Sequence, residues 1–105
     1  MRRIGCVTLF LFWLYLLPAQ DRVTLSGDVS DSFSKETLLG VTILIPELNT
    51  GTVTNNYGFY SISVPPGDYT ISVQYLGYQT LQFPLSLIEN TKQNILLTPA
   101  AEELD

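Results

Sequence analysis

The segment Gly51–Tyr78 constrains the fold of this chain more than any other part of its sequence. It reads GTVTNNYGFYSISVPPGDYTISVQYLGY, in which runs of alternating apolar and polar residues are separated by turn-forming residues. Alternation places successive side chains on opposite faces of a β-strand, and Gly, Pro and Asn are favoured in turns. The segment therefore predicts two strands, Phe59–Val64 and Tyr69–Tyr75, with a turn on each side of them.

The link between these two strands predicts how they pair. Pro65–Asp68 is a tight-turn sequence. A two-residue loop would place Ile62 opposite Ile71 and Tyr60 opposite Val73, so that both apolar rows lie on the same face. The sequence thus predicts an antiparallel hairpin whose inward rows form the centre of the core.

The rest of the chain repeats this spacing of strands and turns. Further strands are predicted at Val23–Val29, Val41–Ile45, Gly51–Thr54, Gln79–Leu87 and Thr91–Thr98. Pro46 ends or bulges one of them and Pro84 marks an edge or a bulge in another, because proline donates no backbone hydrogen bond. Seven strands with turns every 8–12 residues or so predict an all-β sandwich or small barrel.

The N-terminus has the three parts of a secretory signal peptide. Arg2 and Arg3 form a basic start, Ile4–Leu17 is a run of fourteen uncharged residues, and a small residue, Ala19, closes the segment. Fourteen residues are fewer than the ~20 that span a bilayer, so cleavage after Ala19 is favoured over a retained anchor. The predicted organisation is a signal peptide at residues 1–19, a domain at residues 20–98, and an acidic tail or linker at residues 99–105.

Composition removes most kinds of chemistry from the exported part of this chain. There is no histidine, and the single cysteine, Cys6, lies within the predicted signal. A Ser–His–Asp triad, a Cys–His dyad, a structural zinc site and a disulfide are therefore excluded there. No pair of acidic residues stands in the apolar setting that a glycosidase needs. We predict a non-enzymatic domain with no catalytic residue, no metal and no cofactor.

The charge of the chain also limits its partners. From residue 20 onward three scattered basic residues remain against ten acidic ones, a net charge of −7. Nucleic acid is not an expected partner, because phosphate contacts need clustered Lys and Arg. Three acids beside one loop are candidate calcium ligands: Asp28, Asp31 and Glu36. Their spacing does not fit an EF-hand loop, and an aspartate that forms a turn is the favoured interpretation.

One face of the predicted hairpin suggests contact with a ligand or partner. Tyr57 and Phe59 lie on or beside a strand face that is otherwise polar and ends at Gln74. Aromatic side chains on a polar sheet face can stack on sugar rings or pack against a partner. The alternative is that a neighbouring loop covers Phe59. Tyr57, Phe59 and Gln74 are the predicted ligand or partner face, with a glycan as one candidate ligand.

The motifs from Gly27 onward resemble the carboxypeptidase regulatory-like domain. They read GDVSD, LLGVTILI, GTVTNNYGFYSI and VPPGDYTISVQYLGYQT in this order, and the resemblance covers roughly residues 23–98. The fold of that family resembles transthyretin, so the resemblance implies a seven-stranded Greek-key sandwich. The version with these first and last motifs is similar to the N-terminal extension of SusC-type TonB-dependent outer-membrane receptors of Bacteroidetes. Pro46–Asn49 departs from the Gly-Thr that usually follows the second strand.

The resemblance implies a place and a role. The place is the periplasmic side of the outer membrane of a Gram-negative bacterium, with membrane association only through a receptor. The role is protein–protein contact, with the plug and barrel of the receptor or with the TonB-type machinery, in one form by strand addition at an exposed edge. The alternatives are a small exported carbohydrate- or surface-binding module and a structural spacer domain.

Overall fold

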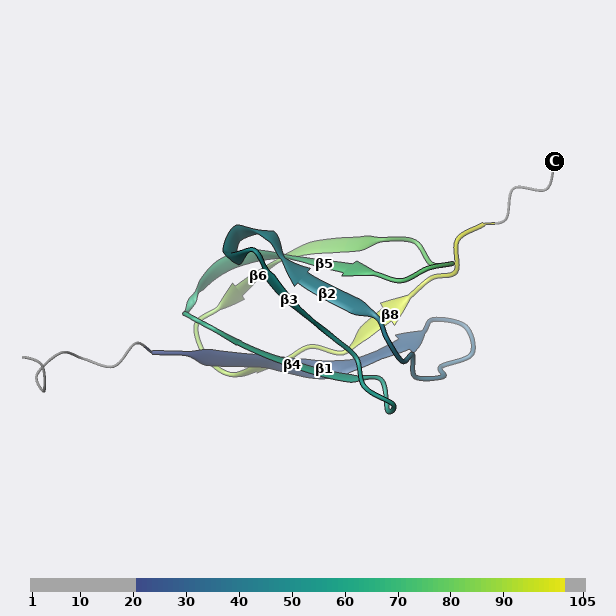
Figure 1. Cartoon of the computed structure of the whole chain (residues 1–105), viewed down its shortest axis with the longest axis horizontal. Coiled ribbons are helices and arrows are strands. Elements are labelled where there is room, and N and C mark those ends of the chain that lie inside the picture. Colours follow the sequence, from purple (N-terminus) through teal and green to yellow (C-terminus); the bar gives the residue numbers. More distant parts are fainter. Residues whose placement is uncertain (1–20, 102–105) are drawn as a thin grey trace, which may run out of the picture.

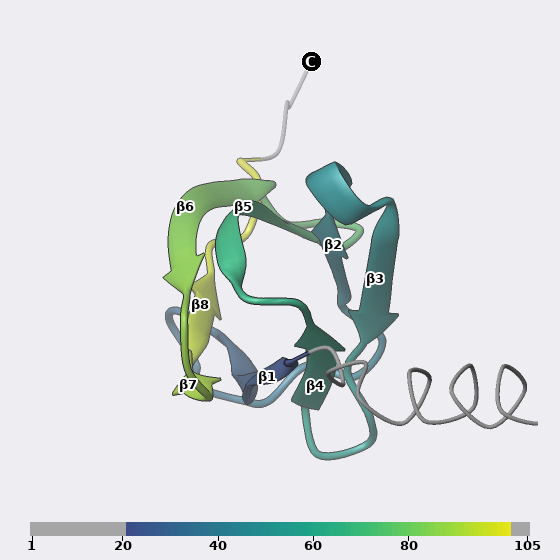
Figure 2. The ribbon, with the colours of Figure 1, turned by 90° about the vertical axis from the view of Figure 1, so that its left-hand side faces the viewer.

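The computed structural model describes residues 21–101 and arranges them in two β-sheets packed face to face (Figures 1 and 2). One sheet has the order β4-β1-β7, with β8 also paired to β1, and the other has the order β3-β2-β5-β6. The elements are β1 (Val23–Asp31), β2 (Thr42–Ile45), a 3-10 turn η1 (Pro46–Leu48), β3 (Thr50–Val53), β4 (Phe59–Val64), β5 (Gly67–Gln74), β6 (Leu81–Leu87), β7 (Thr91–Lys92) and β8 (Ile95–Leu97). The predicted all-β sandwich is confirmed, with eight strands in place of seven.

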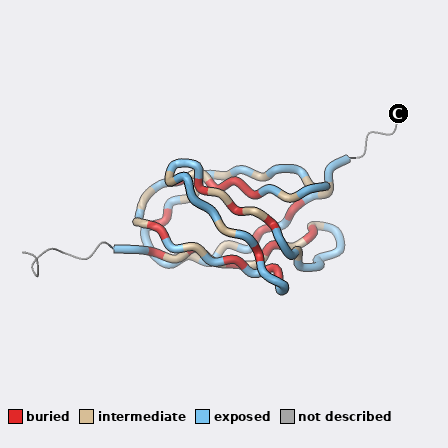
Figure 3. Tube along the Cα trace, in the orientation of Figure 1, coloured by how far each residue is buried: buried red, intermediate tan, exposed pale blue. Residues whose placement is uncertain are grey.

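In most strands, buried residues alternate with more exposed ones, and the buried residues form the core between the sheets (Figure 3). In β1, buried and half-buried residues alternate without a break. The buried apolar side chains are Val23, Leu25, Val29, Val41, Ile43, Ile45, Tyr60, Val64, Tyr69, Ile71, Val73, Leu87, Ile95 and Leu97. Full burial of such a side chain is worth about 1.5–3 kcal/mol, so this set is the main source of stability in the described residues.

The two prolines act on their strands as predicted. β2 ends at Ile45, and Pro46 begins the η1 turn. β2 itself is an inner strand, between β3 and β5, which agrees with its apolar residues on both faces. Pro84 lies in β6, which is an edge strand.

The predicted hairpin between β4 and β5 is wrong. β4 pairs with β1, where Ile62 lies opposite Leu25, while β5 pairs with β2 and β6 in the other sheet. Alternation fixes the face that each side chain takes but not the neighbouring strand, so two strands in facing sheets satisfy it equally well. Pro65 and Pro66 have no backbone N–H for the first rungs of a hairpin, and the chain crosses between the sheets at this point.

The predicted last strand, Thr91–Thr98, is divided into β7 and β8. Both parts run parallel to β1, on the side away from β4. Between them, Asn94 Oδ1 accepts the Asp28 N–H at 3.0 Å, and Gln93 O accepts the Tyr60 hydroxyl at 2.6 Å. A side-chain amide and a tyrosine hydroxyl therefore replace part of the backbone ladder, which is why the strand count rises to eight.

The two ends of the sandwich differ in the links that they carry (Figure 1). The described chain starts at one end, where the η1 turn and the β4–β5 and β6–β7 links also lie. The opposite end carries the β1–β2, β3–β4 and β5–β6 links, and residue 101 leaves the domain there. We call this second end the loop end and define it as residues 32–41, 54–58, 75–80 and 98–101.

Membrane-crossing helices are absent from residues 21–101, since none there is long and apolar enough. The predicted signal peptide at residues 1–19 lies outside the described residues, as do residues 102–105 of the predicted tail. The boundaries of both segments stay predictions.

Candidate functional site

Backbone hydrogen bonds hold the segments of the loop end together. They join Ser32 to Leu97, Gly40 to Thr54, Gln79 to Thr98 and Ala100 to Gly77, with donor–acceptor distances between 2.8 and 3.1 Å. Thr54 adds to these bonds, because its buried hydroxyl donates to Leu38 O at 2.6 Å and accepts the Val41 N–H at 2.9 Å. The loop end is therefore one connected surface, built from segments up to 66 residues apart in the sequence.

The carboxylate of Asp31, the last residue of β1, is hydrogen-bonded to three residues of the loop end. Its Oδ1 accepts the backbone N–H groups of Phe33 at 2.7 Å and Ser34 at 2.9 Å, which is the predicted turn chemistry. Its Oδ2 accepts the Tyr78 hydroxyl at 2.7 Å. The bond from Tyr78, followed by those from the two amides, holds the pKa of Asp31 below its ordinary value. The same bond raises the pKa of Tyr78.

Replacing Tyr78 by Phe removes this bond while keeping the ring, so we expect the Asp31 pKa to rise toward its ordinary value. A depressed carboxyl pKa contributes stability that is present above the unfolded-state pKa of about 4 and is lost as the pH falls through the folded-state pKa. The intact protein should therefore lose stability on acidification below about pH 4, and Tyr78→Phe should lose less over the same range.

NMR titration of the Asp31 carboxyl carbon and thermal unfolding at neutral and acidic pH check this expectation. Tyr57→Phe is the matched control, because the Tyr57 side chain is 79% exposed in a turn. An Asp31 pKa that is the same in the intact protein and in Tyr78→Phe would contradict the assignment.

Large apolar side chains are exposed on the loop end. The exposed fractions are 76% for Phe33, 54% for Leu39, 79% for Tyr57 and 97% for Leu76. At the opposite end the exposed large apolar side chain is Ile88, at 73%. We call Phe33, Leu39, Tyr57 and Leu76 the loop-end apolar residues. They come from the β1–β2, β3–β4 and β5–β6 links. Large exposed apolar areas are typical of contact sites, whereas single exposed apolar side chains are ordinary surface.

The structure places the predicted partner residues in two different sheets. Tyr57 belongs to the β3–β4 turn and Phe59 begins β4, and Asn55 Oδ1 accepts both of their N–H groups, at 2.9 and 3.1 Å. Phe59 is 40% exposed. Gln74 ends β5 in the other sheet and lines a separate open hollow with Leu76. The three residues therefore do not share one sheet face, although all of them lie at or beside the loop end.

Sequence reasoning did not single out Phe33, Leu39 or Leu76. Each lies in a segment interpreted only as a turn or a lead into a strand, and their exposure depends on loops that pair far along the chain. The signal that points to Phe33 and Leu76 is a large apolar residue among turn-forming residues, in SDSFSKE and in LG. Such a residue lies outside the alternating rows and has no strand face to enter the core.

The loop end offers little for catalysis or metal binding. Among residues 21–101, no group of three or more His, Cys, Asp or Glu side chains is placed to hold a metal ion. Asp28 and Asp31 lie on opposite faces of β1, because three positions separate them in an alternating strand.

Comparison with known proteins gives one family and one curated relative. The model of the CarboxypepD_reg-like domain matches residues 25–105. The TonB-dependent receptor SusC of Bacteroides thetaiotaomicron is 29% identical over 84 residues, which are 80% of this chain. The same match spans only 8% of the length of that receptor.

Similar solved structures support the fold alone. A type II Cohesin-X-Dockerin complex from Acetivibrio cellulolyticus matches 71% of this chain and 56% of its own, with a TM-score of 0.64 and 24% identity. The C-terminal domain of the shaft pilin spaA from Lactobacillus rhamnosus GG matches 77% of this chain and all of its own, with a TM-score of 0.59 and 14% identity. At these identities the sandwich is shared, and its use is not indicated.

Proposed function

The chain belongs to the family of CarboxypepD_reg-like domains, and on this basis we propose that it is the N-terminal module of a TonB-dependent outer-membrane receptor. The module is non-enzymatic and lies on the periplasmic side of the outer membrane. It works by protein–protein contact with the rest of the receptor or with the TonB-type machinery that energises it. The substrate that such a receptor would carry is not part of the proposal.

The position of the loop-end apolar residues is the observation that best supports a role in protein–protein contact. These residues lie in links at the same end of the sandwich as the C-terminal exit of the described chain, so a following domain would begin at this end. Apolar side chains that are fully covered contribute about 25 cal/mol per Å² of buried surface, and aromatic side chains such as those of Phe33 and Tyr57 are enriched at interfaces. The match to 8% of a receptor is consistent with a module that is a small part of a longer protein.

Two measurements test the proposal, and the first is to read the gene past codon 105. We expect a continuing frame that encodes a plug and a barrel. The second measurement uses single-cysteine variants of the complete gene product in a Cys6→Ser background. Leu76→Cys is expected to react with a maleimide at least tenfold more slowly in the whole receptor than in the 105-residue chain.

Ile88→Cys is the matched control, because its side chain is also exposed but lies at the opposite end of the sandwich. It is expected to react equally fast in both proteins. A stop codon directly after Asp105 would contradict the receptor context. Equal protection of the two cysteines, or of neither, would contradict contact through the loop end.

A carbohydrate- or surface-binding module is the second candidate function. The exposure of Tyr57 and Phe59, which are held by one Asn55 side chain, favours it. Aromatic rings presented in this way can stack on sugars. This function would appear as glycan binding by the chain alone that disappears in Phe59→Ala, with Leu76→Cys still reactive in the whole protein.

A further inference from the structure

The outer edge of β3 has unpaired backbone groups. Thr54 N–H donates to Val41 O at 2.9 Å, so the backbone groups of Thr54 face β2. Successive residues of a strand direct their N–H and C=O groups alternately toward the partner strand and away from it. Thr52 therefore faces β2, while Gly51 and Val53 direct their N–H and C=O groups to the free side. None of these four groups has a backbone partner outside the β-ladder of the described residues. β3 also contains no charged residue and no proline, the devices that commonly block an edge.

The edge at β6 is blocked by proline. The Glu47 carboxylate accepts the Thr70 N–H at 2.9 and 3.0 Å, which places that N–H on the β2 side of β5. Pro84 lies opposite Thr70, so its nitrogen faces the free side of β6. A donor is therefore missing at the middle of that edge.

The β4 edge is partly occupied, and the other remaining edges are short. In β4, Phe59, Ser61 and Ser63 direct their backbone groups away from β1, because the residues opposite them, Asp28, Ser26 and Thr24, form their bonds on the β7 and β8 side of β1. The two backbone groups of Ser61 have no partner among the described residues, so this edge is open at its middle. Phe59 is bonded at both groups by Asn55, and the Arg22 guanidinium donates to Ser63 O. β7 and β8 are two and three residues long. Among the described strands, β3 is the edge with the most complete set of free groups.

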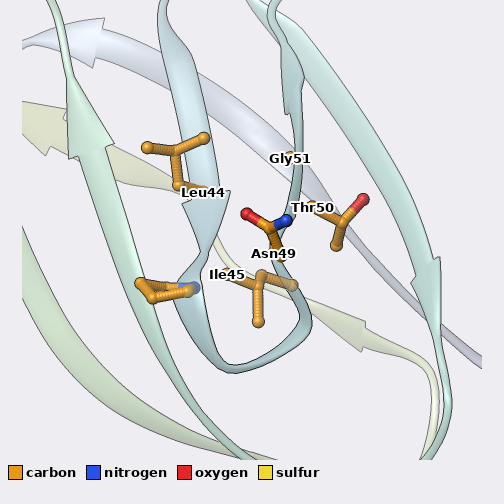
Figure 4. Close-up of a pocket in the computed structure, with 6 residues that line it drawn as sticks. Leu44, Ile45, Asn49, Thr50 and Gly51 are labelled. Atoms are coloured by element: carbon orange, nitrogen blue, oxygen red, sulfur yellow. The ribbon is translucent and has the colours of Figure 1, made fainter.

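An apolar hollow of about 430 Å³ adjoins this edge (Figure 4). It is lined by Leu44 and Ile45 of β2, by Pro46 and Asn49 of the turn, and by Thr50 and Gly51 of β3. A methylene at Gly51 would lie 2.7 Å from Leu44 Cδ2, so the Leu44 side chain occupies the space that a larger residue would fill. Leu44 thereby reaches the sheet edge, where the side chain of an added strand would meet it.

We propose that the β3 edge receives an extended segment of a partner polypeptide that carries an aliphatic residue and flanking basic residues. The segment adds as a fifth strand, bonds to the backbone of Gly51 and Val53, and places its aliphatic side chain on Leu44 and the hollow. This contact is separate from the one proposed for the loop end, and it does not depend on the receptor context.

Charge selects this occupant over a second copy of the chain. Residues 21–101 carry seven acidic against three basic side chains. Hydrogen bonds from Thr70 hold the pKa of Glu47 below its ordinary value, so the η1 turn, whose first residue Pro46 lines the hollow, carries a negative charge. A second copy would bring the same negative excess to a four-residue strand, whereas a basic segment is attracted to it.

The test uses a phage-displayed library of random twelve-residue peptides as the probe, panned on the purified protein. Synthetic peptides from enriched clones are then measured by fluorescence anisotropy. Val53→Pro removes one outward N–H without removing a bond to β2, and it should weaken binding at least tenfold. Ser61→Pro is the matched control, because Ser61 has the same outward orientation in β4, and it should leave binding unchanged.

Circular dichroism establishes that both proline variants are folded. If Val53→Pro unfolds the domain, amide exchange of Gly51 and Val53 in the intact protein replaces it, and slower exchange with peptide bound supports the proposal. The proposal is overturned if no peptide is enriched, or if binding survives Val53→Pro in the folded protein. It is also overturned if the intact protein is a dimer that Val53→Pro dissociates, which would make a second copy the occupant.

Discussion

The protein carrying Val73→Asp is expected to be unfolded at neutral pH and 25 °C. Val73 is 0% exposed, in a strand that is paired on both sides, with Ile43 and Leu81 opposite it. An ionised carboxylate without a partner in such a site costs several kcal/mol. Domains are stable by roughly 0.05–0.15 kcal/mol per residue, so the cost is comparable to the whole free energy of unfolding. Far-UV circular dichroism and urea titration measure the loss.

Two further aspartate variants make this prediction specific. Leu76→Asp, at a side chain that is 97% exposed, should change the free energy of unfolding by no more than about 0.5 kcal/mol. Ile62→Asp should lie between the two, because Ile62 is half-buried in the same row as Tyr60 and Val64. A cooperative transition of Val73→Asp at the wild-type midpoint would show that the inward row of β5 is misassigned.

Gly27→Ala is the second large effect that we expect, at about 1–3 kcal/mol or somewhat more. A methyl group at Gly27 would lie 2.1 Å from Gln93 O and 2.6 Å from Gln93 C, and backbone cannot rotate away as a side chain can. The chain between β7 and β8 must therefore move. The shift also removes the acceptor of the Tyr60 hydroxyl, and a buried hydroxyl without a partner costs about 1–3 kcal/mol.

Tyr60 provides an independent test of the displacement of the chain between β7 and β8. Burial, followed by the charge of Asp28, raises the pKa of Tyr60 to about 12, so its hydroxyl is a protonated donor at neutral pH. Tyr60→Phe should therefore destabilise the wild type more than it destabilises Gly27→Ala, since the two changes share one bond. Ser26→Ala, at the neighbouring half-buried position, should be close to neutral. A Gly27→Ala melting midpoint equal to that of the wild type would contradict the close approach of the two backbones.

The sequence predicts the strands of this domain better than their partners. Period-two alternation reports only the face of a side chain, and it correctly places Tyr60, Val64, Ile71 and Val73 inward. The partner of each strand depends on the crossing at Pro65 and Pro66, where local turn chemistry also fits a hairpin. The strand pairing is therefore mispredicted at a turn sequence that is compatible both with a hairpin and with a crossing between the two sheets.

Burial of polar residues is the other point that pattern reasoning could not supply. Ser72 lies on the face predicted to be polar, yet it is 2% exposed, because it stands on an inner strand between Leu44 and Gln82 of the flanking strands. The bond between Asp31 and Tyr78 joins positions 47 residues apart, and neither residue carries a local sign of the other. The loop end is likewise held together by hydrogen bonds between residues that are far apart in the sequence, so a local pattern cannot predict them.

The parallel pairing of β1 and β8, the first and last strands of the described residues, determines how the domain responds to a pulling force. Residue 21 and residue 101 lie at opposite ends, and β8 runs beside β1 in the same direction. Tension applied between the termini would pull these two strands past each other, so that their hydrogen bonds bear the load together in shear. An antiparallel pair pulled from one end would instead open one rung at a time. A domain built in this way can transmit a pulling force along its length before it unfolds.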